Sequence, residues 1–101
     1  MEQDVNAEVF SRMNALRRGL HLHSVLYYHY HQPLISDAAF DERTAELLKI
    51  QAEHPTLAVR GYAPQVFKGW NGNTGMHFPK TDYIIGLAAA ILLIAKQRGE
   101  S

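Results

Sequence analysis

The sequence contains no cysteine, and its 101 residues carry no formal net charge. The absence of cysteine excludes disulfides, thiolate nucleophiles and zinc sites built on cysteine, and it fits a reducing compartment. Ten basic side chains balance ten acidic ones, so the composition offers no positive excess for a nucleic-acid backbone. We therefore expect a protein that does not bind nucleic acid directly.

Long hydrophobic runs are also missing. The most apolar segment, residues 83–95 (YIIGLAAAILLIA), has 13 residues, whereas a helix that spans a bilayer needs about 20. The first twenty residues carry Glu2, Asp4, Glu8 and Arg12 and lack the basic-then-apolar order of a signal peptide. The sequence thus predicts a cytoplasmic protein without a membrane segment.

The usual patterns of catalytic and metal-binding residues are absent as well. The histidine pairs His21/His23 and His29/His31 are spaced by two, which places their rings on opposite sides of a helix, whereas zinc-binding helices use a spacing of four. No nucleophile with a nearby base, phosphate-binding glycine loop or lysine nucleophile motif occurs. We expect no metal site and no catalytic residue, with the histidines at the surface or at the core edge.

Apolar residues recur at steps of three and four from about residue 6 to residue 31, which predicts one long amphipathic helix. Pro33 should end this helix, because proline removes a backbone donor and restricts the residue before it. Its outer face should carry four polar side chains: Glu8, Arg12, Arg18 and His21.

A second helix is predicted from about Asp37 to Glu53, with Ser36 or Asp37 as its N-cap and Pro55 as its stop. Its inner stripe is expected to contain Phe40, Thr44, Leu47, Leu48 and Gln51. Two helices joined by a short connection pack most simply as an antiparallel hairpin.

Prolines and glycines concentrate in residues 55–80, which predicts a long loop of a kind that is often functional or mobile. Part of it, around Val66, Phe67 and Trp70, should fold back as a short strand or turn. A last helix is predicted from the N-cap pair Thr81-Asp82 to about residue 98, with Gly99 as a stop. This helix is apolar on nearly all sides, so we expect it to contact another copy or a protein partner.

The predicted fold class is therefore all-α, in one small domain of ordinary hydrophobic content. It comprises a helical hairpin over residues 6–54, a long loop over residues 55–80 and an apolar C-terminal helix over residues 81–98.

The corner between the first two predicted helices, residues 27–41 (YYHYHQPLISDAAFD), gathers aromatic rings and carboxylates. Asp37 and Asp41 are four residues apart and so share one helix face. Aromatic faces attract a cationic ring, and carboxylates accept hydrogen bonds from an amide or a ribose. The corner is therefore a candidate ligand site; the alternative is that its rings are core and its acids only cap a helix.

This corner resembles the motif YY-x-x-D-x-P-x-(I/V)-S-D-x-x-Y-D of bacterial NAD-dependent DNA ligases, with the best match at residues 36–41 (SDAAFD). The resemblance covers about residues 16–57, including residues 46–48 (ELL) and 53–57 (EHPTL). Two positions depart from the motif: Phe40 stands where the family has tyrosine, and His31 where it has aspartate.

In that family, the small N-terminal helical domain, called Ia, grips the nicotinamide mononucleotide half of NAD. Carried over by position, the resemblance implies that NAD or nicotinamide mononucleotide is a possible ligand. The ligand-binding residues that it implies are Tyr27, Tyr28, Asp37, Phe40 and Asp41.

The family's adenylation domain, DNA-binding module and zinc module have no counterpart in these 101 residues, so the chain alone is expected to be no enzyme and to require no cofactor. The leading hypothesis is a non-catalytic module that binds or sequesters a nicotinamide-type or related nucleotide. The alternative is a protein-interaction or inhibitory module that self-associates or docks on a partner through its apolar C-terminal helix. A third hypothesis is that the chain supplies a nicotinamide site to a separate adenylation domain.

Overall fold

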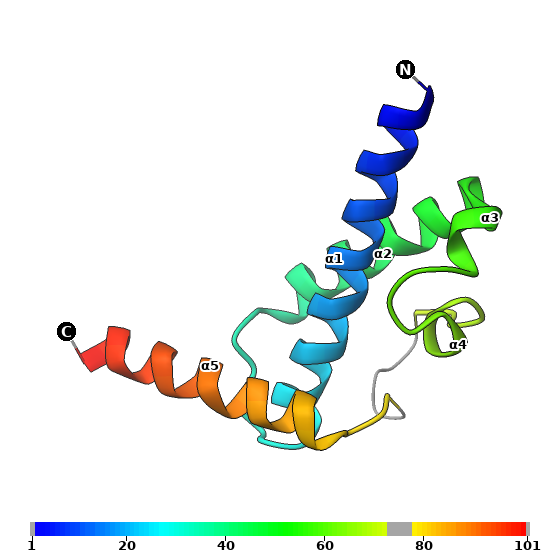
Figure 1. Ribbon diagram of the computed structural model, residues 1–101. Helices are drawn as coiled ribbons and strands as arrows, with labels where there is room; N and C mark the ends of the chain where they lie inside the picture. Colours follow the sequence, from blue (N-terminus) through cyan, green and yellow to red (C-terminus); the bar gives the residue numbers. More distant parts are fainter. Residues whose placement is uncertain (1, 73–77, 101) are drawn as a thin grey trace.

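The computed structural model describes residues 2–72 and 78–100. Five helices follow one another along them: α1 (Glu2–Tyr28), α2 (Asp37–Glu53), α3 (Pro55–Ala58), α4 (Pro64–Phe67) and α5 (Asp82–Glu100). No strand occurs within these two ranges, which confirms the predicted all-α class (Figure 1).

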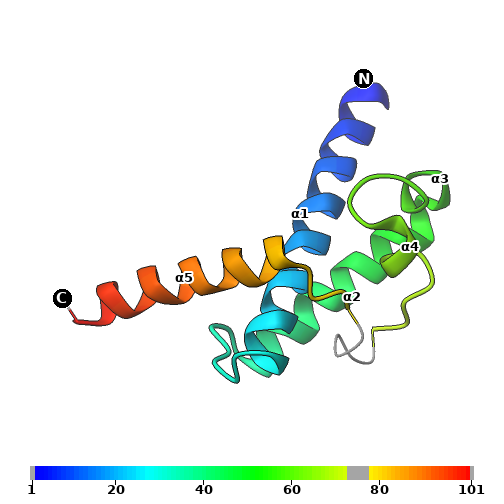
Figure 2. The same ribbon diagram turned by 60° about the horizontal axis from the view of Figure 1, so that its bottom comes forward.

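The helices α1 and α2 form the predicted hairpin, in which α2 runs back across α1 at an oblique angle (Figures 1 and 2). The main core lies between these two helices, and the aromatic rings of Phe67 and Phe78, from the chain after α3, complete it. Its buried members are Met13, Leu16, Leu20, Leu47, Phe67 and Phe78. Ser36 is the N-cap of α2, since its hydroxyl accepts a hydrogen bond of 3.1 Å from the Ala39 amide.

The first helix ends three residues earlier than predicted, at Tyr28 instead of residue 31. His31 has a left-handed backbone with φ of 55°, and the Gln32 amide donates to the Leu26 carbonyl over 2.9 Å. This turn, and not Pro33, ends the helix. Pro33 restricts only the residue directly before it, Gln32, which already lies outside the helix.

Within the predicted loop of residues 55–80, the structure has two single-turn helices, α3 and α4. Phe67, for which a strand or turn was predicted, lies in α4 and is buried in the core. Proline at the first position favours each short helix, because its fixed φ suits the first turn and its missing N–H is not needed there. Residues 73–77 of this predicted loop lie outside the described residues.

Arg17, in the middle of α1, is completely buried and uses all five of its N–H donors. Nε and one Nη2 hydrogen donate to Oε1 of Gln51 on α2, over 3.0 and 2.8 Å. The other three donate to the carbonyls of Ala58, Arg60 and Tyr62, over 2.6, 2.7 and 3.0 Å. One guanidinium group therefore attaches α2 and the segment after α3 to α1.

His21 was predicted on the outer face of α1, and this prediction is wrong, whereas Glu8, Arg12 and Arg18 are exposed as expected. The His21 ring is buried, with Nδ1 2.6 Å from the Tyr62 hydroxyl and Nε2 2.6 Å from the Pro79 carbonyl. The segment after α3 covers this side of α1, so the helix has two buried faces instead of one.

The last helix, α5, begins after Thr81, whose hydroxyl accepts from the Ile84 amide over 3.3 Å, and it passes through Gly99, where a stop was predicted. Its first half packs through Ile84 and Ala88 against Val25 and Leu26 of α1. The remainder of α5 extends away from the body (Figures 1 and 2). Along α5 as a whole, four large apolar side chains are exposed: Tyr83 and Leu87 in the first half, and Leu93 and Ile94 in the second. None of the helices in the described ranges is long and apolar enough to cross a membrane.

We expect Arg17→Met to lower the free energy of unfolding by about 3 kcal/mol or more, because three buried carbonyls and Gln51 would lose their donors. Arg12→Met is the matched control: Arg12 pairs with Glu46 over 2.6 Å at the surface, and an exposed pair contributes about 1 kcal/mol or less. Urea unfolding of both variants is the measurement. Equal losses in the two would contradict the structural role of Arg17.

Candidate ligand-binding site at the corner of α1 and α2

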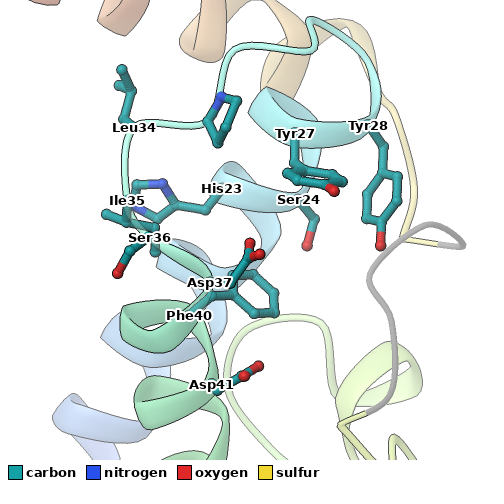
Figure 3. A pocket seen from close by; sticks show the side chains of 11 residues that line it. His23, Ser24, Tyr27, Tyr28, Leu34, Ile35, Ser36, Asp37, Phe40 and Asp41 are labelled. Atoms are coloured by element: carbon teal, nitrogen blue, oxygen red, sulfur yellow. The ribbon is translucent and has the colours of Figure 1, made fainter.

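A cavity of about 290 Å³ lies at the corner where α1 ends and α2 begins (Figure 3). Its lining comes from the last two turns of α1, the connection and the first turn and a half of α2: His23, Ser24, Tyr27, Tyr28, Pro33, Leu34, Ile35, Ser36, Asp37, Phe40 and Asp41. Its volume is near the lower end of the roughly 300–1,000 Å³ of small-molecule sites. The cavity suits one small ligand or one end of a larger one.

The structure brings all five predicted site residues to this one cavity. Tyr27 and Tyr28 are the last two residues of α1, and Asp37, Phe40 and Asp41 lie on one face of the first turns of α2. Steps of three and four residues place the α2 side chains on the same face. Their role in ligand binding stays a prediction.

The aromatic residues differ in how far packing explains them. Phe40 lines the cavity and is also packed, half-buried, against the main core. Tyr27 is 46% exposed, and its ring lies edge-on to that of Tyr28 with 4.8 Å between centroids. Core packing therefore accounts for part of the position of Phe40, but it does not account for the exposed ring of Tyr27.

Both carboxylates are exposed at the cavity, and helix capping does not explain them fully. Ser36 already provides the side-chain cap of α2, so Asp37 contributes only its charge near the positive end of the helix dipole. Asp41 lies one turn further along, and neither acid has an ion-pair or hydrogen-bond partner among the described residues. Both are available to accept hydrogen bonds from a ligand.

His23 and Ser24 also line the cavity, and the sequence analysis did not select them. The Ser24 side chain is buried at 2% exposure, and neither its Oγ nor Nδ1 of His23 has a hydrogen-bond partner within the described part of the chain. Their spacing of three and four residues from Tyr27 and Tyr28 was the available signal. A buried polar atom without a partner costs about 1–3 kcal/mol, so both atoms carry unused hydrogen-bonding capacity next to the cavity.

The electrostatic character of the cavity is acidic. Burial, together with the positive charge of Arg43, lowers the pKa of His23 below its usual value of 6.5, so its ring is neutral at pH 7. No lysine or arginine lines the cavity, which leaves Asp37 and Asp41 as its charged groups. The described residues hold no group of three or more histidine, aspartate or glutamate side chains that could bind a metal ion.

Residues 6–61 match the family model described as "DNA ligase-like, N-terminal NAD+-binding domain". Similar proteins include the DNA ligases of Methylococcus capsulatus, 45% identical over 53 residues, Desulforamulus reducens, 39% over 54, and Acidobacterium capsulatum, 40% over 52. These matches cover 52%, 54% and 52% of the chain but only 8% of each ligase. No solved structure matches. The matched segment contains every residue that lines the cavity and excludes α5.

We expect the His23 ring to titrate below pH 6.5 in an NMR pH titration, because burial and Arg43 disfavour its protonated form. The unfolded chain then binds a proton that the folded chain does not. Stability is therefore complete above the unfolded pKa and decreases as pH falls through it. When the pH is lowered from about 7.5 to about 5.5, the His23→Gln variant should lose less free energy of unfolding than the unsubstituted protein. An equal loss in the two would be evidence against a lowered pKa of His23.

Proposed function

The chain belongs to the family of DNA ligase-like, N-terminal NAD+-binding domains, and on this basis we propose that its corner cavity binds the nicotinamide end of NAD-type ligands without a catalytic step. The observation that carries this proposal is the gathering of Tyr27, Tyr28, Asp37, Phe40 and Asp41 around one cavity. A cytoplasmic location, proposed from the composition, would give the protein access to such ligands.

The chemistry of the lining suits a nicotinamide group. The faces of Tyr27 and Phe40 offer contacts to a cationic pyridinium ring, worth about 0.5–2 kcal/mol for each cation–π contact. Asp37 and Asp41 accept hydrogen bonds from ribose hydroxyls or an amide. The lining therefore provides both stacking and polar recognition.

The same cavity lacks an activated nucleophile. Ser24 is its buried hydroxyl, yet its Oγ makes no hydrogen bond to His23 or to any other described group, whereas a nucleophilic serine needs a base within hydrogen-bond reach. No lysine lines the cavity. We therefore assign the cavity a role in holding or sequestering its ligand.

Nicotinamide mononucleotide, nicotinamide riboside and NAD should shift the amide resonances of cavity residues and release or take up heat in calorimetric titration. Asp41→Asn should weaken binding about tenfold or more, because a charge-assisted hydrogen bond contributes about 1.5–3 kcal/mol. Glu42→Gln is the matched control, since Glu42 is the next residue along α2 and does not line the cavity. Absence of any shift or heat with all three ligands at millimolar concentration would refute the proposal.

A second candidate function is self-association through α5. Tyr83, Leu87, Leu93 and Ile94 are exposed, and no charged residue occurs in residues 83–95. A second copy offers the same apolar face, and two-fold pairing brings one such face against the other. The C-terminal half of α5, which carries Leu93 and Ile94, extends away from α1 and α2 (Figure 2).

If α5 pairs two copies, light scattering should give the mass of a dimer at micromolar concentration. Leu93→Glu should then yield monomers, because it places a charge at a side chain that is 59% exposed on the apolar face. Gln97→Glu adds the same charge one turn further along at a polar position and should leave the dimer intact. A monomeric mass for the unsubstituted protein at high concentration would remove this candidate.

A further inference from the structure

We propose that the cavity recognises a pyridinium nucleoside and discriminates against its 5′-phosphate, so that nicotinamide riboside binds more tightly than nicotinamide mononucleotide. This inference rests on the proposed function and specifies the chemical class of its ligand.

The first argument is the charge of the lining. Asp37 and Asp41 are its ionised side chains at pH 7, and no lysine or arginine lines the cavity. Two carboxylates and the aromatic faces of Tyr27, Tyr28 and Phe40 attract a positively charged ring. A phosphate ester adds a charge of about −1.5 to −2 at neutral pH, and the carboxylates repel it.

The second argument concerns the N-terminus of α2, because helix N-termini are the usual backbone sites for phosphate. At α2 this position is already occupied: the Ser36 hydroxyl accepts from the Ala39 amide, and the Asp37 carboxylate lies in the first turn. The Phe40 amide donates to the Ser36 carbonyl over 3.0 Å. The Ala39 amide is therefore already bonded, a carboxylate lies beside the remaining first-turn amides, and no lysine or arginine lines the cavity to hold a phosphate.

Arg43 is a cation close enough to this lining for its charge to help lower the pKa of His23. Arg43 belongs to α2 but does not line the cavity. Its effect on His23 keeps that ring neutral, which removes the remaining side chain of the lining that could carry a positive charge. Arg43 thus acts on the cavity through space and supplies no direct contact to a phosphate there.

The test is a calorimetric comparison of nicotinamide riboside with nicotinamide mononucleotide at low ionic strength. The riboside should bind roughly three- to tenfold more tightly, the range expected for the repulsion between a phosphate and two carboxylates across water with partial screening. In about 1 M salt the two affinities should converge, because the Debye length falls to about 3 Å.

Three variants locate the effect. Asp41→Asn should reduce the preference for the riboside, whereas Glu53→Gln, a neutralisation at the far end of α2, should leave it unchanged. Arg43→Gln leaves both carboxylates in place, and a selective loss of mononucleotide binding in this variant would contradict the inference, because it would show that Arg43 holds the phosphate.

The outcomes separate this inference from the proposal on which it rests. Equal or tighter binding of the mononucleotide at low ionic strength overturns the discrimination against phosphate and leaves the nicotinamide site in place. Binding of neither ligand overturns the proposed function and this inference together.

Discussion

The fold depends on the demand of one buried guanidinium group for hydrogen-bond acceptors. A charge without solvent is costly unless it is fully hydrogen-bonded, and none of the acceptors that Arg17 contacts among the described residues is a carboxylate. Its acceptors are the Gln51 side chain and three backbone carbonyls, so the chain after α2 must return across α1 to present them. Gln51 in turn donates to the Phe67 carbonyl over 3.0 Å, which extends the same network to α4. A polar network thus orders the segment that a sequence pattern alone would leave as a loop.

The same contacts help to fix the position of the corner cavity, because other parts of the chain restrain the last turns of α1 from two sides. The carbonyl network and the His21 contacts fix the middle of the helix, and α5 packs on Val25 and Leu26 near its end. Tyr27 and Tyr28 follow immediately, so their backbone starts from a restrained helix. The opposite wall is the start of α2, which Ser36 caps. Two restrained helix ends therefore position the aromatic and acidic side chains.

Local rules account for the parts of the structure that the sequence predicted well. The periodicity of α1 and α2, the Ser36 cap and the four-residue spacing of Asp37 and Asp41 depend on neighbours within a turn or two, and the resemblance to the ligase motif nominated residues that do meet at one cavity. Burial of Arg17 and His21 depends on carbonyls and a hydroxyl 41 or more residues away. No local pattern marks such partners, so an arginine and a histidine were assigned to the surface or passed over. His23 and Ser24 were missed for a different reason. They are single polar residues in a helix, and the sequence does not show that α2 and the connection enclose a cavity beside them.

The cavity has the unusual property that all of its walls come from one short continuous segment, residues 23–41. Forming it requires the closure of only one short connection, and loop-closure entropy is small for so few residues. Local contacts of this kind form early, whereas the carbonyl network of Arg17 must wait until residues more than 40 positions apart have met. During folding, the recognition corner can thus be assembled before the remainder of the molecule has closed over α1.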